Sequence, residues 1–551
     1  MDTTTIESLA NSQQKKLILH FDINKTLVLA DTRLRHSKED SLNLLLSKYA
    51  WGRIEQKDSE SYWKLVTNHF SFTKPEEDLI SYNQYISSLL PEITAEQEPT
   101  QEKRDEENKK INMQRQQYYN TFCRSSSPGM KLKPEYDRIL KNICIPANVQ
   151  EDIKQQIEKL SQQQGKQQLP DANQNTQRIF KSDQECVYPT PSKYLQFFQD
   201  GKYQILPGFY RMIIQLLRLK RDFTIVFHSF ADNLYDIIAE FNLFCRGEHP
   251  CYNGKNNTPQ VRLDGVRSQK NFIINERSMG LIYRYNEDVN ESALVMGTLK
   301  RVPKIKNLED EYEKELEEDS ISIHKGVHTI YSYLKQMSLE RGAFALNHDY
   351  QFWVNNGQKN QFSKPLLIDQ QNLDALHIFF DDNVTEGDDC IIDLRDAVTG
   401  QQIPIKKSID KYLVTISMLD LLRDPDYLLK CIDTCEKKRD EEIYRIINGI
   451  SEEEVKKPEK SKFQLLQESN KSEYLRHTVL PLLYPAFQLV DKERPHDPIS
   501  FIALYCLKNQ DKVKVPTPNE EYLQEHQQKY KSLEKIVQSS QQEGQQSLNK
   551  L

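Results

Sequence analysis

Three short runs of apolar residues, each ending at a polar side chain, predict buried β-strands. They are residues 17–22, 223–229 and 376–382, which read LILHFD, FTIVFHS and LHIFFDD. Apolar runs of this length without regular polar alternation are typical of strands that are buried on both faces. Amphipathic helical patterns flank the second run, at residues 209–219 and 233–244. The pattern therefore predicts an α/β fold, with a parallel sheet covered by helices.

Polar side chains stand where each of these three runs ends: Asp22, Ser229, and the pair Asp381 and Asp382. The carboxyl ends of parallel strands are where ligands bind in open α/β sheets, so these groups are candidates for one site. Several carboxylates in one place repel each other unless a cation lies between them, and oxygen ligands suit Mg²⁺. A single aspartate after a strand is more often a turn or cap residue, but three strand ends in order favour a site.

The same residues resemble the motifs of the haloacid-dehalogenase-like (HAD) superfamily over about residues 12–440. Residues 21–26, FDINKT, are similar to its first motif, and Ser229 at the end of an apolar strand is similar to its second. Residues 379–383, FFDDN, are similar to the fourth, and Lys364 is the favoured third-motif lysine, 17 residues before Asp381. The resemblance implies a Rossmann-like parallel sheet with helical or mixed cap inserts.

The resemblance also implies roles for these side chains. Asp22 would be the nucleophile that forms an aspartyl-phosphate, Ser229 would bind a phosphoryl oxygen, and Lys364 would neutralise charge. Lys300, Lys325 and Lys359 lie in the same interval and remain alternatives to Lys364. The implied catalytic residues are Asp22, Asn24, Ser229 and Lys364, and the implied Mg²⁺ ligands are Asp22, Asn24 through its carbonyl, Asp381 and Asp382.

Asn24 departs from the superfamily pattern, which usually has an aspartate two residues after the nucleophile. That aspartate protonates the leaving oxygen and later activates water, and a carboxamide can do neither. The sequence therefore leaves two hypotheses. The favoured one is a Mg²⁺-dependent phosphatase or phosphotransferase, and the alternative is a catalytically weak or inactive scaffold. If the protein is an enzyme, His20 or His228 is a candidate to replace the missing proton carrier.

The spacing of the strands predicts two long inserts in the α/β domain. The first, at residues 27–205, contains an aromatic-rich stretch at 49–90 that we expect to form a small helical subdomain, and the second, at 245–345, contains a predicted hairpin. Segments at 95–118 and 150–184 are rich in Gln, Lys and Glu, and we expect them not to fold alone. The predicted parts are a flexible start (1–11), the α/β domain (12–440), a charged linker (441–470), a helical motif (471–511) and a disordered tail (512–551).

Composition excludes several other functions. The chain of 551 residues has a formal net charge of -7, which argues against nucleic acid as a main partner. Its nine cysteines show no paired spacing typical of a disulfide framework or zinc module. No stretch approaches the roughly 18 apolar residues that span a bilayer, so we expect a protein of a reducing compartment without a membrane partner.

A second family resemblance lies near the C-terminal end of the sequence. Apolar residues from Leu475 to Val490 fall on one helical face, and Asp497 with Pro498 predicts the start of a second helix that runs to about Lys508. Pro485 falls inside the first helix and is expected to kink it. Two such helices cannot bury both apolar faces alone, so a dimer is expected. The predicted dimerisation and docking residues are Leu475, Val479, Leu482, Leu483, Phe487, Ile499, Ile502 and Leu507.

This region resembles the Dpy-thirty motif, a relative of the dimerisation and docking domain of the protein kinase A regulatory subunit. The matching text includes residues 492–495, KERP, and residues 497–505, DPISFIALY. The resemblance implies a homodimer through residues 471–511 whose groove receives an amphipathic helix of an anchoring protein. By analogy it also implies an axonemal complex in a cilium, with the nucleus as the weaker alternative.

Overall fold

The computed structural model describes residues 15–29, 37–57, 60–164, 195, 197–231, 233–266, 270–286, 288–302, 308–372, 374–448, 475 and 479–509. The chain divides into two compact units, Met1–Glu442 and Ile443–Leu551, and each is described by itself. None of the helices within these ranges has the length and apolar character that crossing a membrane requires.

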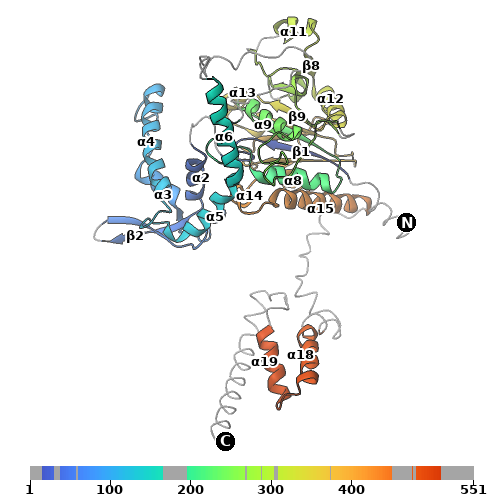
Figure 1. Ribbon diagram of the computed structural model, residues 1–551. Coiled ribbons are helices and arrows are strands. Elements are labelled where there is room, and N and C mark those ends of the chain that lie inside the picture. The colour runs from blue at the N-terminus through green and yellow to red at the C-terminus, as the bar shows by residue number, and fades with distance from the viewer. Residues whose placement is uncertain are drawn as a thin grey trace. The chain divides into compact units, whose positions relative to one another are not determined.

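An eight-stranded sheet forms the centre of the first unit (Figure 1). Neighbouring strands are parallel from β13 to β6, and β7 and β8 then join antiparallel. The three predicted strands are confirmed, and they lie side by side with β1 in the middle. In sheet order the strands are β13 (Leu413–Thr415), β11 (Ala375–Asp381), β1 (Lys16–Asp22), β5 (Phe223–Ser229), β9 (Ala343–Asn347), β6 (Met279–Tyr283), β7 (Ala293–Met296) and β8 (Ser322–Lys325).

Two hydrophobic clusters cover the two faces of this sheet, which explains why the central strands are apolar throughout. One face packs against α8 (Pro207–Arg218), α9 (Leu234–Arg246), α14 (Met418–Arg423) and α15 (Tyr427–Asn448). The other packs against α12 (Val327–Glu340) and Leu367 of β10 (Lys364–Ile368). The remaining apolar residues of β10 and those of its parallel partner β12 (Ile392–Asp396) belong to the first cluster. The mixed α/β class with a mostly parallel sheet is therefore confirmed.

The first insert differs from its prediction. Residues 49–90 form an antiparallel sheet of β3 (Glu60–Leu65), β2 (Trp51–Lys57) and β4 (Ile80–Ser81), followed by α3 (Tyr82–Leu89), and not a helical subdomain. Position 52 in β2 requires a glycine, because a Cβ there would lie only 2.5 Å from the Trp63 ring. The helices around it are α2 (Lys38–Ser47), α4 (Gln101–Thr121), α5 (Lys133–Ile143) and α6 (Ala147–Gln164).

Two segments that were expected not to fold contain helices. Most of 95–118 lies in α4, whose Tyr119 is buried and whose Gln116 donates to the Asp40 carbonyl oxygen of α2 at 2.9 Å. The first part of 150–184 continues α6, and the rest, like 512–551, lies outside the described residues. The predicted linker at 441–470 begins inside α15, which ends at Asn448.

The second insert contains the predicted hairpin, because β6 and β7 pair antiparallel. The hairpin is not a separate cap, since β6 also pairs in parallel with β9 and so extends the central sheet. The sequence prediction missed β9, a five-residue strand with the sequence AFALN. The short helices α10 (Leu308–Glu311) and α11 (Glu313–Glu317) fall in the charged run before β8, and α13 (Tyr350–Asn355) follows β9.

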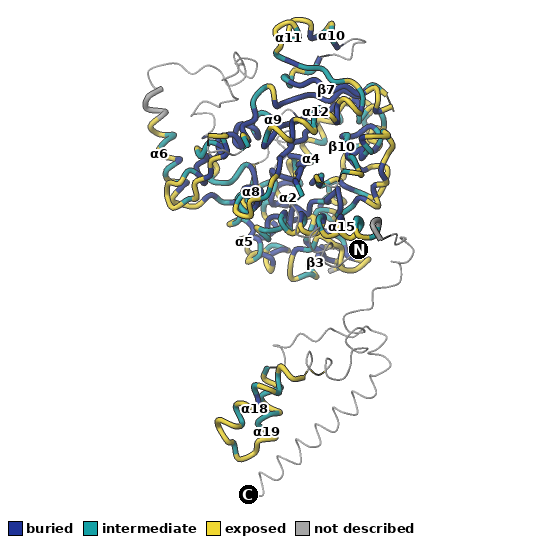
Figure 2. Tube along the Cα trace, turned by 90° about the vertical axis from the view of Figure 1, so that its right-hand side faces the viewer, coloured by how far each residue is buried: buried dark blue, intermediate teal, exposed yellow. Residues whose placement is uncertain are grey.

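The second unit contains a pair of helices, α18 (Leu480–Glu493) and α19 (Pro498–Asn509). Asp497 caps α19, because its Oδ1 accepts from the backbone N–H groups of Ile499 and Ser500 at 3.1 Å each. Helix α18 continues through Pro485. Figure 2 shows both helices coloured mainly as exposed or intermediate, in contrast to the buried sheet of the first unit.

Candidate active site

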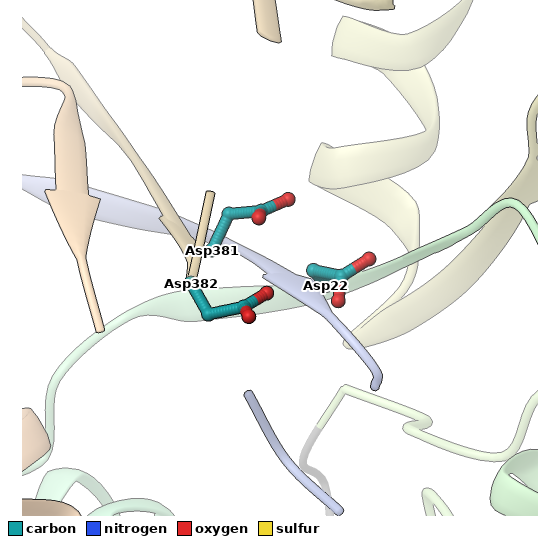
Figure 3. Close-up of side chains that lie close together, drawn as sticks. All are labelled: Asp22, Asp381 and Asp382. Carbon is teal, nitrogen blue, oxygen red and sulfur yellow. The ribbon is translucent and has the colours of Figure 1, made fainter. Parts of the chain in front are cut away.

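Three aspartates meet at the carboxyl ends of β1 and β11. Phe21 pairs with Phe380 across the two strands, so the residues that follow, Asp22 and Asp381, end neighbouring strands. Asp382 comes next in the chain, and carboxylate oxygens of all three residues lie within 4.8 Å of one another (Figure 3). Asp22 and Asp381 are buried, and Asp382 is partly exposed.

Lys364 joins two of these aspartates. Its Nζ donates to Asp22 Oδ1 at 2.6 Å and to Asp381 Oδ2 at 2.8 Å, and the lysine is 1% exposed. The alternatives Lys300, Lys325 and Lys359 are all exposed, so the structure brings only the favoured lysine into this cluster.

A buried ion pair holds the strand that carries this lysine. Arg284, which follows β6, lies 3.0 Å from Asp393 of β12 and donates to the Gln361 carbonyl oxygen at 2.7 Å. Because β12 pairs with β10, these contacts fix the start of β10, where Lys364 is the first residue. The position of the lysine is therefore set by three segments that are far apart in the sequence.

Burial shapes the acid–base properties of the cluster. It raises the pKa of Asp22 to about 7, opposed by Lys364 and helped by Asp381. It also raises the pKa of Asp382 to about 7, with further contributions from Asp381 and Asp22. Burial alone would lower the pKa of Lys364, but the carboxylates of Asp22 and Asp381 outweigh burial and raise it, so the lysine stays charged.

Ser229 and Asn24 lie at the same end of the sheet but bond elsewhere. Ser229 ends β5, next to β1, and its Oγ accepts from the Ala231 backbone N–H at 2.9 Å. Asn24 follows β1, and its Oδ1 accepts from Asn233 Nδ2 at 2.9 Å. Neither side chain hydrogen-bonds to one of the three aspartates. The Ser229 hydroxyl is thus placed at the strand end next to Asp22, and the Asn24 side chain bonds to the amide of Asn233.

A chain of four histidines crosses the sheet face that carries Asp22. His377 Nδ1 lies 3.0 Å from His20 Nε2, His20 Nδ1 lies 2.9 Å from His228 Nε2, and His228 Nδ1 lies 2.8 Å from His348 Nε2. Sequence reasoning named two of these residues and missed His348 and His377. The available signal was that His20, His228 and His377 lie within or beside the same apolar runs as the aspartates.

The histidine chain argues against His20 or His228 as a replacement proton carrier. Both ring nitrogens of each residue already bond to another histidine. Burial lowers the pKa of His20 well below its usual range, and the neighbouring His228 and His377 lower it further. Burial acts in the same direction on the pKa of His228, together with His348 and Lys364. Neither histidine has a free nitrogen to offer a substrate.

The donor set fits a hard divalent cation. Within the described ranges, these aspartates form the one group of three or more potential ligands from His, Cys, Asp and Glu. A bound cation would stabilise the charged form of these carboxyl groups, whose pKa is raised. Mg²⁺ prefers oxygen ligands in sites with few carboxylates. A carboxylate, a buried ammonium group and a hydroxyl at one sheet edge can bind and attack a phosphoryl group.

One part of this chain matches a known protein family. Residues 470–511 match the family model of the Dpy-30 motif, so the helix pair α18 and α19 belongs to a dimerisation and docking module. No curated protein and no solved structure matches the chain. The resemblance of the first unit to the HAD superfamily therefore depends on its residues and their geometry alone.

Proposed function

We propose that the first unit is a Mg²⁺-dependent phosphatase or phosphotransferase similar to the HAD superfamily, and that the Dpy-30 motif tethers it as a homodimer. The observation that carries the proposal is the pair of hydrogen bonds from Lys364 to Asp22 and Asp381. Burying a charged group is costly unless it is paired. The burial of Lys364 between two carboxylates is therefore typical of a functional site and not of an ordinary surface lysine.

In the proposed reaction an Asp22 carboxylate oxygen attacks phosphorus and forms an aspartyl-phosphate, while the bond from phosphorus to the ester oxygen breaks and the electron pair leaves with that oxygen. Lys364 stabilises the negative charge that gathers on the phosphoryl oxygens, and Ser229 contributes a hydroxyl hydrogen bond. Asp22, Asp381 and Asp382, with the Asn24 carbonyl, would hold Mg²⁺, which screens the approach of the anionic substrate to the carboxylate. Water then hydrolyses the aspartyl-phosphate and releases phosphate.

The second proposed function is a catalytically weak scaffold, and Asn24 is the observation that favours it. Loss of a positioned acid or base typically lowers a rate about 10² to 10⁴-fold. In this alternative the first unit is a structural block with little or no catalytic activity, and the Dpy-30 motif carries the function by receiving an amphipathic helix of an anchoring protein. A ciliary axonemal complex is the proposed setting for both functions, by analogy with other proteins that carry this motif.

One experiment separates the two functions. We expect Mg²⁺-dependent binding of beryllofluoride, a phosphoryl mimic, to the full chain, and loss of this binding in Asp22→Asn. We expect slow hydrolysis of an aryl phosphate by the native chain, and an increase of about 10² to 10⁴-fold in Asn24→Asp, because the carboxylate restores proton transfer.

The control is Asn112→Asp, which adds the same charge on the exposed surface of α4 and should leave hydrolysis unchanged. If beryllofluoride does not bind and Asn24→Asp gains no activity, the enzyme proposal is wrong and the scaffold stands.

A further inference from the structure

A cavity of about 310 Å³ lies beside the candidate active site, between the segments that follow β5 and β9. Two of its lining residues contact the groups assigned to phosphate. Lys364 Nζ lies 5.2 Å from the centre of the Phe230 ring, and the backbone N–H of Ala231 donates to Ser229 Oγ. Its lining includes Phe230, Leu299, Arg301, Asn347 and Tyr350.

The walls of this cavity suit an aromatic ring. Phe230 and Tyr350 meet edge to face with ring centres 5.8 Å apart, and Trp353 stacks on Phe230 at 5.4 Å, which fixes the orientation of the Phe230 ring. A cavity of about 150 Å³ lined by apolar side chains is large enough to bind benzene. The volume here is about twice that, so it has room for a substituted ring.

The cavity lining also contains polar residues. Arg301 and Asn347 line it together with the aromatic residues, and Arg301 Nη2 donates to Asn347 Oδ1 at 3.2 Å. Both side chains carry several N–H donors, so the cavity offers hydrogen bonds to an acceptor atom of a ligand. The occupant should therefore combine a flat apolar body with an oxygen or nitrogen.

The chemistry of Asn24 leads to the same class of ligand. Without an acid at this position, the leaving oxygen must depart as an anion and take its proton from solvent afterwards. A phenol has a pKa of about 10, whereas water has a pKa of about 15.7, a value close to that of simple alcohols. A phenolate therefore leaves without help far more readily than an alkoxide.

We propose that this cavity binds the leaving group of an aryl phosphate monoester, such as a phosphorylated tyrosine side chain. The inference depends on the proposed phosphatase function and names its substrate class. An Asp22 oxygen forms a bond to phosphorus, the bond from phosphorus to the phenolic oxygen breaks, and the electron pair leaves with that oxygen. The phenolate takes a proton from water after departure.

The test compares phenyl phosphate with methyl phosphate, using the full chain with Mg²⁺. We expect kcat/KM for phenyl phosphate to exceed that for methyl phosphate at least 100-fold. Asn24→Asp should narrow this ratio at least tenfold, because an added acid helps a poor leaving group more than a good one. Leu299→Trp, which fills the cavity from a half-buried position, should lower kcat/KM for phenyl phosphate at least tenfold more than for methyl phosphate.

A second variant tests the cavity in case Leu299→Trp does not fold. Tyr350 is 38% exposed, so Tyr350→Ala should fold. It should also lower the ratio of kcat/KM for phenyl phosphate to kcat/KM for methyl phosphate. The control, Tyr118→Ala, removes an exposed tyrosine of α4 and should leave the ratio unchanged.

Three outcomes would overturn the inference. Similar cleavage of both esters, or a preference for phenyl phosphate that survives both cavity variants, would overturn the inference and leave the proposed phosphatase intact. Cleavage of neither ester, with no binding of beryllofluoride, would overturn the phosphatase proposal as well.

Discussion

Lys364 is a buried charged residue at the centre of the candidate site. It is almost completely buried and stands between two acidic side chains, each within 2.8 Å of its Nζ. A buried ion pair adds little net stability, but removal of one partner leaves an uncompensated charge and typically costs about 3–5 kcal/mol. The lysine is therefore expected to be a strong determinant of folding as well as of phosphate binding.

We predict that Lys364→Met lowers the free energy of unfolding by about 3–5 kcal/mol at pH 8 in the absence of divalent cations. The loss should shrink at pH 5, because burial raises the pKa of Asp22 to about 7 and its carboxyl group can then take up a proton and become neutral. Urea denaturation followed by circular dichroism measures the change. The matched control, Lys359→Met, removes an exposed lysine and should stay within about 0.5 kcal/mol of the native chain. Equal stability of the two variants would show that Lys364 is not paired as described.

The raised pKa values of the aspartates predict how cation binding depends on pH. Asp22 and Asp382 both have a pKa of about 7, so protons compete with Mg²⁺ for their oxygens below this value. Mg²⁺ affinity should fall by about tenfold per pH unit for each proton displaced between pH 7 and 6, and should be almost constant above pH 8. Calorimetric titration at pH 6, 7 and 8 measures the profile.

Two variants test whether the aspartates cause this pH dependence. Asp382→Asn should bind Mg²⁺ more weakly and with a shallower pH dependence, since it removes one of the two competing protonation sites. Asp389→Asn, at an exposed position in the same loop, should reproduce the native profile. An affinity that is constant from pH 6 to 8 would contradict the assignment of the aspartates as ligands.

The candidate site shows how far sequence alone reaches at the residue scale. Asp22, Asp381 and Asp382 could be predicted to meet, because Asp22 and Asp381 end strands that are recognisable by their apolar runs, and Asp382 is the next residue. The choice of Lys364 among four lysines could not be made from spacing. It depends on Arg284 and Asp393, which hold the start of β10 from two other segments. Contacts across three separate segments leave no local pattern in the sequence.

At the scale of elements, prediction succeeded where burial controls the pattern and failed where it does not. β1, β5 and β11 are covered on both faces, so their sequences are apolar throughout and easy to recognise. Helix α4 buries little, and its composition resembles that of a disordered segment. It is composed largely of residues with high helix propensity and has ion pairs one turn apart, such as Lys110 with Glu106 and Glu107.

The aromatic stretch of the first insert shows a second limit at this scale. Its aromatic residues indicated a local core but gave no information on whether helices or strands would build it. Trp63 and Tyr82 do pack together, with ring centres 5.1 Å apart, yet Trp63 lies in β3 and Tyr82 begins α3. Amino-acid content predicted the core, and only the pairing of β2 with β3 determines the fold around it.

At the scale of the whole molecule, the chain combines a candidate phosphate-handling unit with a docking module. The helix pair of the second unit exposes several large apolar side chains that a lone pair of helices cannot bury. Those side chains with more than half of their surface exposed are Tyr484, Phe487, Ile499, Leu504 and Leu507. Such exposure in a Dpy-30 motif is what dimerisation and the binding of a partner helix would cover.

We predict that Phe487→Asp converts the dimer into a monomer, because a charge placed in an apolar interface has no partner to offset its desolvation. Gln488→Asp, at the next and also exposed position of α18, should leave the dimer intact and serves as the control for added charge.

Deletion of residues 471–551 should likewise give a monomer in sedimentation velocity, while the first unit keeps its folded circular dichroism spectrum and its Mg²⁺-dependent binding of beryllofluoride. These results would place dimerisation in the second unit alone. A truncated chain that still sediments as a dimer would instead show that the first unit self-associates, and the docking module would then lose its proposed role in assembling the pair.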